Sequence, residues 1–448
     1  MKIFIFICAF ALLATSLKID LERRLTKEPI QDRIDRQIKE GRLKMMTIDE
    51  LRADAMLKEK NFGDNPVIEL KNYQDLQYYG PAFVGSKNQE FSMVYDTGSE
   101  WFWIPNKGCN GCPNKNAFEA ASSDTFVDTG VNQELFYGQG HVTGNIGTDM
   151  IGIGKDDAAQ MRFVLVDFAE DISGQKADGI AGLTPTTTLG GDLMVEKLAG
   201  EGIINANEFT VFIGKAGFDK SWIEFGKNID DQTDVKFLNL EPLTPQDDLT
   251  YWSTPYTSLQ AGDETLNLAT KMTIWDTGTS LIGAKPDDVV TMAQALAKGK
   301  EIGQIPEGFL ASLCDRVDDT PPLIFNFNGH EVKIEPKEFV LRSSGYCVYL
   351  IMPLDLDGML LGDSFLRGSK IIHDVDGKRL GIFPQKFYKS SSGLLWLWIL
   401  LPVLGVILIG IGGFCLYKRR VEKKSYITAG GNIQNKAMHG NYQRVGGN

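Results

Sequence analysis

The sequence carries one short motif twice, and this internal repeat constrains the fold more than any other feature. The segment 93–99 reads Met-Val-Tyr-Asp-Thr-Gly-Ser, and the segment 273–279 reads Thr-Ile-Trp-Asp-Thr-Gly-Thr. About 85 residues after each copy, two apolar residues and a glycine follow, at 180–182 and 360–362. Both parts of the pattern recur after 180 residues. Such a repeat predicts two related lobes that face each other.

The body of the chain has the pattern of a mainly β protein. Its short apolar runs are separated by Gly, Asn and Asp, which favour turns. The clearest of these runs are 91–95, 163–166, 209–213 and 222–225. One helix is expected over 287–298, where acidic residues occupy the first turn.

The length of 448 residues and a hydrophobic content of 43% are sufficient for two lobes with a large core. We expect an N-terminal lobe over 63–240 and a C-terminal lobe over 241–390. The preceding segment, 17–62, differs from both because it is rich in charge and has apolar residues at helical spacing. We expect it to be a prosegment; the alternative is a charged, helix-prone linker.

Both ends of the chain are typical of a membrane protein that enters the secretory pathway. Residues 1–16 combine one lysine, an apolar run and a small-residue cleavage pattern, which predicts a signal peptide rather than a short buried helix. The uncharged segment 393–417 is long enough to cross a bilayer. The tail 418–448 begins with basic residues, which favours a cytoplasmic location. These features predict a single-pass type I membrane protein of the secretory or endosomal–lysosomal system, or of the cell surface.

The formal net charge of −12 argues against nucleic-acid binding, which needs a basic surface. Four of the six cysteines fall in the part expected in an oxidising compartment: Cys109, Cys112, Cys314 and Cys347. They allow three pairings, of which we expect the disulfides Cys109–Cys112 and Cys314–Cys347. A redox-active or zinc-binding Cys-x-x-Cys is the alternative. No second pair has a zinc-like spacing, so we expect no metal and no cofactor.

A single Asp-Thr-Gly is weak evidence, since Asp and Gly are ordinary turn residues. Two copies that each follow an apolar strand and each have an apolar-apolar-Gly partner are far more specific. Over residues 62–388 the sequence resembles the pepsin family of aspartic peptidases. The segments that carry this resemblance are 96–99, 103–105, 137–138, 178–183, 276–280 and 360–363.

The resemblance implies a bilobal fold with a cleft between the lobes, and a catalytic pair formed by Asp96 and Asp276. Two carboxyl groups about 3 Å apart cannot both be charged, so they share one proton and titrate as a pair. The ionised member can then activate a water, while the protonated member donates to the peptide carbonyl. The substrates implied are peptides or proteins, and the resemblance suggests a monomeric enzyme made as a zymogen and active at acidic pH.

The resemblance also assigns supporting roles. Ser99 and Thr279 correspond to hydroxyls that hydrogen-bond the catalytic carboxylates, and Thr97 and Thr277 to a pair that braces the two loops. Gly98 and Gly278 allow the backbone to turn tightly beside each carboxylate.

A hairpin with Tyr137, Gly138 and Gln139 at its tip corresponds to a mobile flap over the substrate, with the Tyr137 hydroxyl directed toward Trp103. The alternative is a surface hairpin with an exposed tyrosine. Tyr251 corresponds to a residue that lines the cleft.

The segment 100–102, Glu-Trp-Phe, departs from the family pattern, where small or polar residues are usual. A carboxylate so close to the catalytic pair leaves the pH optimum and the pocket shape open. Two other functions remain as alternatives: a catalytically silent peptide receptor on the same fold, and a membrane adaptor that acts through the sorting-like segment 442–445 of its tail.

Overall fold

The computed structural model describes residues 38–39, 44–45, 68–73, 77–112, 116–138, 140–172, 175–215, 221–228, 232–306 and 308–384. All of these belong to one compact unit, Met1–Gln385. The predicted signal peptide, membrane span and tail, together with Gln139, lie outside the described residues. Within the described ranges, no helix combines the length and the apolar character needed to span a bilayer.

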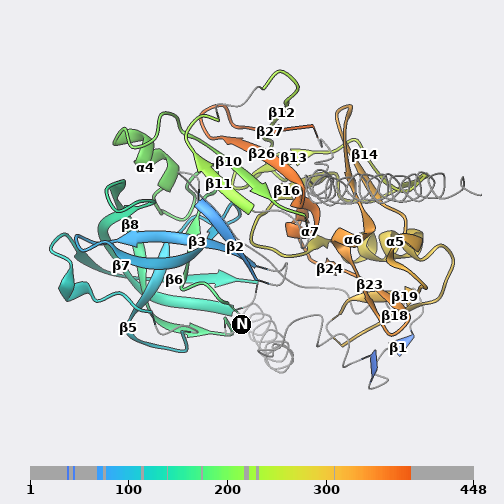
Figure 1. Ribbon diagram of the computed structural model, residues 1–448, viewed down its shortest axis with the longest axis horizontal. Coiled ribbons are helices and arrows are strands. Elements are labelled where there is room, and N and C mark those ends of the chain that lie inside the picture. The colour runs from blue at the N-terminus through green and yellow to red at the C-terminus, as the bar shows by residue number, and fades with distance from the viewer. Residues whose placement is uncertain are drawn as a thin grey trace, which may run out of the picture. The chain divides into compact units, whose positions relative to one another are not determined.

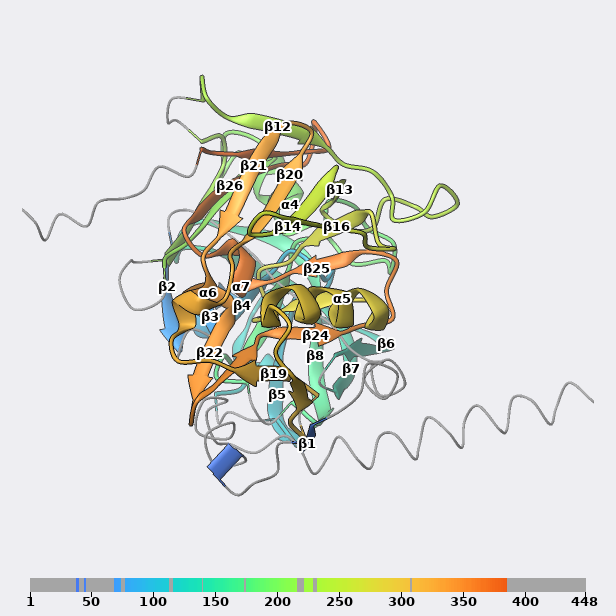
Figure 2. The same ribbon diagram turned by 90° about the vertical axis from the view of Figure 1, so that its right-hand side faces the viewer.

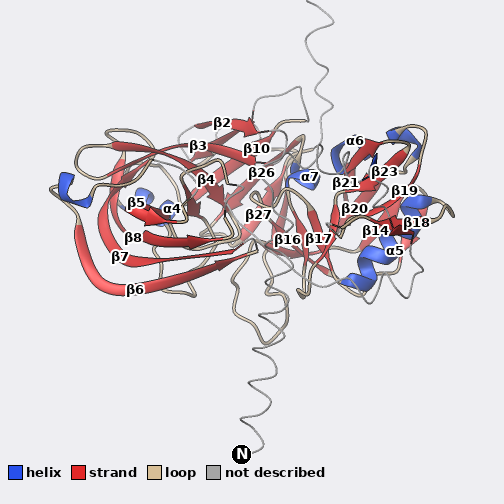
Figure 3. Ribbon diagram, turned by 90° about the horizontal axis from the view of Figure 1, so that it is seen from below, coloured by secondary structure: helices blue, strands red, loops and turns tan. Residues whose placement is uncertain are grey.

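The described part of the chain is mainly β, as expected, and one sheet of 13 strands runs through it (Figures 1 and 3). Its strands, from one edge to the other, are β12 (Lys236–Asn239), β27 (Arg379–Ile382), β26 (Ser369–Asp374), β10 (Glu208–Ile213), β11 (Ser221–Phe225), β2 (Ile68–Tyr73), β3 (Gln77–Val84), β4 (Gln89–Asp96), β9 (Gly179–Gly182), β5 (Trp103–Asn110), β8 (Ala158–Glu170), β7 (Gly140–Gly152) and β6 (Val127–Tyr137).

Three smaller sheets build most of the C-terminal part, on the right of Figure 1. The first contains β13 (Ser253–Pro255), β16 (Met272–Trp275), β25 (Met359–Leu361), β17 (Ile282–Ala284) and β24 (Ile351–Pro353). The second contains β15 (Glu264–Leu266), β14 (Ser258–Ala261), β20 (Leu323–Phe327) and β21 (His330–Ile334). The third contains β1 (Lys44–Met45), β18 (Ile302–Gln304), β19 (Leu310–Leu313), β23 (Tyr346–Tyr349) and β22 (Val340–Ser343).

Short helices complete the described fold: α4 (Met194–Gly200), α5 (Pro286–Ala297), α6 (Pro336–Phe339) and α7 (Asp363–Leu366), with 3₁₀ turns η1 (Ala120–Ser122) and η2 (Val317–Asp319). Helix α5 is the helix predicted over 287–298, displaced by one residue. Pro286 occupies its first turn, where a missing N–H costs nothing, and Lys298 ends it in a left-handed conformation.

The two expected lobes are joined by hydrogen bonds within the large sheet. Strand β10, from the N-terminal half, pairs antiparallel with β26, near the end of the chain, from Glu208 opposite Asp374 to Ile213 opposite Ser369. Figure 3 shows β10, β26 and β27 between the two groups of strands. The last strands of the chain therefore complete a sheet that the N-terminal half begins.

The internal repeat is visible as one strand arrangement that occurs twice. Strand β4 runs parallel to β9, and β16 runs parallel to β25, so each Asp-Thr-Gly loop begins where the first strand of such a pair ends. The glycine that ends each apolar-apolar-Gly segment allows the neighbouring strand to pass close to that loop. A Cβ atom on Gly182 would lie 2.6 Å from the Ser99 carbonyl oxygen, and one on Gly362 would lie 2.0 Å from that of Thr279. Only glycine lets these backbones approach so closely.

Aromatic side chains of the core pack against Trp275, the residue before Asp276 in the second motif. Trp275 packs against Phe327 and Phe365 with ring centroids 5.0 and 5.1 Å apart, and its indole N–H donates to Thr254 Oγ1 at 2.9 Å. All of these aromatic side chains are fully buried. The residue that precedes Asp276 is thus fixed both by packing and by a hydrogen bond.

Candidate active site

Asp96 ends β4 and is fully buried. The backbone N–H groups of Gly98 and Ser99 donate to its Oδ1 at 2.9 and 2.7 Å, and the Ser99 hydroxyl donates to Oδ2. The carbonyl oxygen of Asp96 accepts from Leu183 N at 2.6 Å. Three donors from the following turn thus fix the orientation of the carboxyl group, as the resemblance suggested for Ser99.

Asp276 directly follows β16 and is also fully buried. The Thr279 hydroxyl donates to its Oδ2 at 3.1 Å, and the Asp276 backbone N–H donates to Leu361 O at 3.0 Å. The position of Thr279 relative to Asp276 repeats that of Ser99 relative to Asp96.

Asp276 lies against the turn that follows Asp96. A Cβ atom added to Gly98 would lie 2.9 Å from Asp276 Oδ1 and 3.2 Å from its Cγ. A side chain at position 98 would therefore displace the second carboxyl group. Gly98 is required by this contact with the other loop, and Gly278, at the equivalent position of the second loop, is half-buried.

Two threonines brace the loops through hydrogen bonds that cross between the halves of the chain. Thr97 Oγ1 donates to Trp275 O at 2.8 Å, and Thr277 Oγ1 donates to Tyr95 O at 3.0 Å. Thr277 N also donates to Thr97 Oγ1 at 3.3 Å. Each loop is thus held by the strand that carries the other loop.

Burial is the largest cause that raises the pKa of Asp96 well above its usual range, and the nearby charge of Asp276 raises it further. The hydrogen bonds from Ser99 and Gly98 favour the ionised form and oppose this shift. The net direction means that Asp96 retains a proton at a pH where an exposed aspartate has lost it. Two carboxyl groups that interact in this way titrate as one pair.

The hairpin predicted around Tyr137 is present as β6 and β7, in which Tyr137 pairs with Gly140. The rings of Tyr137 and Trp103 lie 6.3 Å apart between centroids. Burial raises the pKa of the Tyr137 hydroxyl well above its usual range and the charge of Asp96 adds to this, while Trp103 and Ser99 oppose it. Tyr137 is therefore directed toward the catalytic loop in this structure, and Gly138 beside it is buried.

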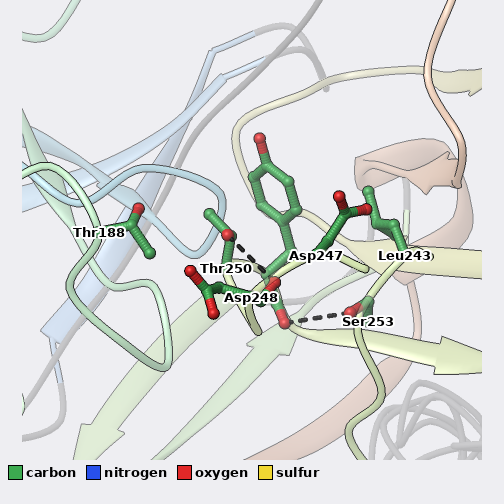
Figure 4. A pocket seen from close by; sticks show the side chains of 7 residues that line it. Thr188, Leu243, Asp247, Asp248, Thr250 and Ser253 are labelled. Atoms are coloured by element: carbon green, nitrogen blue, oxygen red, sulfur yellow. Dashed lines mark hydrogen bonds between the residues drawn. The ribbon is translucent and has the colours of Figure 1, made fainter. Parts of the chain in front are cut away.

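Tyr251 lies in the wall of a pocket of about 220 Å³ (Figure 4). Thr188 stands on one side of this pocket, and the segment 243–253 forms the other side. The neighbour of Tyr251, Trp252, connects the pocket to both motifs. Its indole N–H donates to Leu183 O at 2.7 Å, and its carbonyl oxygen accepts from Trp275 N at 2.9 Å.

Glu100 follows the first catalytic turn but does not face the aspartates. Its side chain is buried, with 3% exposed, and accepts hydrogen bonds from the backbone N–H groups of Thr188 at 2.6 Å and Leu189 at 2.7 Å, and from that of Gly191. Sequence reasoning noticed the unusual carboxylate but missed this role, because its partners lie some 90 residues away.

The structure contains the disulfides Cys109–Cys112 and Cys314–Cys347, as expected. The first lies at the end of β5 beside the flap, where both cysteines pack against the cluster that contains Trp103 and Val166. The second ties β23 to the residue after β19. Among the residues with described positions, no cluster of His, Cys, Asp or Glu has the form of a metal site.

A family model described as Eukaryotic aspartyl protease matches residues 77–385, which include both motifs and the hairpin of β6 and β7. Pepsin A of Gallus gallus is 28% identical over 330 residues, which cover 70% of this chain and 86% of that protein. Pepsin A of Bos taurus is 28% identical over 327 residues, with coverage of 70% and 86%. Pepsin-3 of Oryctolagus cuniculus is 27% identical over 345 residues, with coverage of 74% and 86%. With its two Asp-Thr-Gly motifs and this match over both halves, the chain belongs to the eukaryotic aspartyl protease family.

Proposed function

We propose that this aspartic endopeptidase hydrolyses peptide bonds with a water molecule held between Asp96 and Asp276. The observation that carries the assignment is the approach of the buried Asp276 carboxyl group to the turn that holds the buried Asp96, where a Cβ atom on Gly98 would lie 2.9 Å from Asp276 Oδ1. The raised pKa of Asp96 supports a pair that holds one proton in total.

In this mechanism the ionised carboxylate takes a proton from the water, and the oxygen of that water attacks the carbonyl carbon. The protonated carboxyl group donates to the carbonyl oxygen, which gives a tetrahedral intermediate with no covalent bond to the enzyme. The carbon–nitrogen bond then breaks as one carboxyl group gives its proton to the amine and the other carboxylate takes a proton from a hydroxyl of the intermediate, so a carboxylic acid and an amine leave and the pair again holds one proton. Ser99 and Thr279 keep the carboxyl groups in position, and Tyr137 closes the site from the flap side.

The pH dependence of activity tests this proposal. We expect maximal activity below neutrality, because the pair loses its shared proton as the pH rises. We expect a peptide inhibitor containing statine, which imitates the tetrahedral intermediate, to bind tightly at the same pH. The measurement is kcat/KM from pH 3 to pH 8, with and without the inhibitor. An optimum near pH 8 would contradict the shared-proton mechanism, whereas failure to bind the statine inhibitor would favour the silent peptide receptor.

We also propose that residues 17–62 form an inhibitory prosegment. Part of this segment is attached to the C-terminal half, where β1 pairs antiparallel with β18 at the edge seen in Figure 2. Ile38 is 8% exposed and packs in a cluster with Ile305, Phe309, Ala311 and Val348. These contacts attach the segment to the C-terminal half through a small apolar cluster and one short strand pairing.

Replacing Ile38 by Asp is expected to speed conversion of the zymogen at least tenfold. Burying an unpaired carboxylate in the apolar cluster disfavours the attached state by about 2–4 kcal/mol. The measurement is the rate of chain shortening and of rising activity after a shift from pH 7 to pH 4. Lys39→Gln is the matched control, since the adjacent Lys39 is exposed. If the wild-type chain is fully active at the outset, with no lag and no shortening, residues 17–62 are not an inhibitory prosegment.

For the ends of the chain we propose a signal peptide at 1–16, a membrane span at 393–417 and a cytoplasmic tail at 418–448. The supports are the uncharged apolar run and the basic residues that follow it. The enzyme would then act as a monomer on the non-cytoplasmic side of a secretory, endosomal–lysosomal or surface membrane. Fractionation decides the matter, since a chain that ends at residue 390 should no longer sediment with membranes.

A further inference from the structure

We propose that Glu100 is a positioning residue that determines substrate preference by holding the loop 184–191 as one wall of the pocket beside the catalytic centre. This inference rests on the proposed endopeptidase function and names a residue that sets its specificity. Glu100 does not touch the reacting atoms.

Glu100 accepts three hydrogen bonds from the loop 184–191. The loop residues Thr188 and Leu189 are exposed, yet their backbone N–H groups point inward to Glu100 Oε2 at 2.6 and 2.7 Å. The N–H group of Gly191 donates to Oε1. A carboxylate can accept several donors at once, so one buried side chain satisfies three N–H groups of this loop.

Two glycines make room for Glu100. A Cβ atom on Gly191 would lie 2.9 Å from Glu100 Oε1 and 3.0 Å from its Cγ, so the glycine makes room for the side chain. A Cβ atom on Gly182 would lie 2.5 Å from the backbone carbonyl carbon of Glu100. Gly191 therefore lies against the Glu100 side chain and Gly182 against its backbone, so both parts of this residue depend on a nearby glycine.

Thr188 connects the loop 184–191 to the pocket, and Glu100 connects it to the catalytic centre. Thr188, whose N–H donates to Glu100, stands opposite Asp248 and Thr250 across the pocket (Figure 4). Glu100 itself follows Ser99, which hydrogen-bonds Asp96. The wall formed by Thr188 is thus fixed to the first catalytic turn by the Glu100 side chain, while the start of the loop is held there by the Thr184 N–H, which donates to Ser99 O at 3.1 Å.

The opposite wall is fixed to the same centre by a separate route. Tyr251 and Ser253 flank Trp252, which is hydrogen-bonded to Leu183 and to Trp275. Both walls are therefore positioned by residues adjacent to the aspartates, and the pocket of about 220 Å³ has room for one side chain of a bound peptide. Loosening the Thr188 wall should change which side chain fits and leave the catalytic pair in place.

The experiment compares Glu100→Ala and Glu100→Gln with the wild-type full-length chain. Each is assayed on peptides varied one position at a time over four residues on both sides of the cleaved bond. For Glu100→Ala we expect selectivity at one position to fall about tenfold through KM, with kcat and the pH profile nearly unchanged. Glu100→Gln should be intermediate, because its one carbonyl oxygen still accepts part of the hydrogen bonds. Glu264→Ala, at an exposed position in β15, is the control.

A second measurement follows the loop directly by hydrogen exchange of the segment 184–191. We expect exchange to become at least tenfold faster in Glu100→Ala. Gly191→Ala should also loosen the loop, because its methyl group meets the carboxyl group. In the double variant the methyl group enters the vacated space, so the two effects should not add.

Three results would overturn the proposal. Equal losses at every peptide position, or a shifted pH profile, would mean that Glu100 acts on the aspartates. Unchanged exchange in Glu100→Ala would mean that Glu100 does not hold the loop. Absence of statine-sensitive hydrolysis in the wild-type chain would instead defeat the proposed function and the specificity role with it, while the exchange measurement still decides whether the loop is held.

Discussion

Replacing Asp96 or Asp276 by Asn is expected to lower peptide hydrolysis roughly 10⁴-fold or more while leaving the fold intact. Asn has nearly the same size as Asp but cannot exchange a proton, and the mechanism needs both carboxyl groups. The double variant should be little worse than either single variant, because residues that act as one unit lose their function together. The measurement is kcat/KM on a peptide substrate at the pH optimum, with circular dichroism to confirm folding.

Asp263→Asn is a suitable control, since Asp263 is exposed in the turn before β15. It should retain wild-type activity. If either Asp96→Asn or Asp276→Asn kept more than about one hundredth of the activity, the two-carboxyl mechanism would be wrong.

The second large effect concerns stability at acidic pH and a histidine behind the catalytic centre. His373 on β26 is buried between Phe209, stacked at 4.3 Å, and Trp252, at 4.8 Å between ring centroids. Burial lowers the pKa of His373 from 6.5 to about 3, with a small opposing effect of the Ile371 backbone. Between these pH values the unfolded chain binds a proton that the folded chain does not bind. Stability therefore falls as the pH drops from 6.5 toward 3.

Replacing His373 by Phe should remove this loss. Between pH 7 and pH 4, the free energy of unfolding of the wild-type chain is expected to fall by about 3 kcal/mol more than that of His373→Phe. Denaturant titrations at both pH values measure the difference. They are best made in an Asp96→Asn background, which prevents self-digestion.

The Asp96→Asn background also removes an opposing pH effect. The raised pKa of Asp96 means that the folded state keeps a proton there, which favours folding as the pH falls. His330→Gln is the matched control, because it removes a second imidazole that is only half-buried. An equal loss of stability in wild-type and His373→Phe chains would show that His373 is not the source of the acid sensitivity.

Local sequence and the family resemblance together predicted the elements that carry the site. The strand that ends at Asp96 follows from its apolar run and the turn residues after it. The roles of Asp96 and Asp276 as a pair, and of the hairpin at Tyr137, came from the family resemblance carried by the repeated motif.

What could not be predicted depends on contacts between distant parts of the chain. The pairing of β10 with β26 joins segments separated by more than 150 residues, and neither strand carries a signal for its partner. The orientation of the Glu100 side chain could not be predicted for the same reason. Its position next to the first motif suggested an effect on the aspartates, but its partners are backbone N–H groups of a distant loop. Every residue except proline has such a group, so the sequence does not mark these partners.

The pairing of β10 with β26 also has a consequence for the order in which the protein can be made. Strand β10 ends at Ile213 and its partner begins at Ser369, so roughly 150 further residues must be synthesised before β10 is paired on that side. At about 5–20 residues per second, this edge stays open for roughly 10–30 s. An unpaired strand edge invites pairing with other chains. A ribosome that stalls before Ser369 would therefore leave a nearly complete N-terminal half with an open edge, and that half would be prone to aggregate until the last strands of the chain arrived.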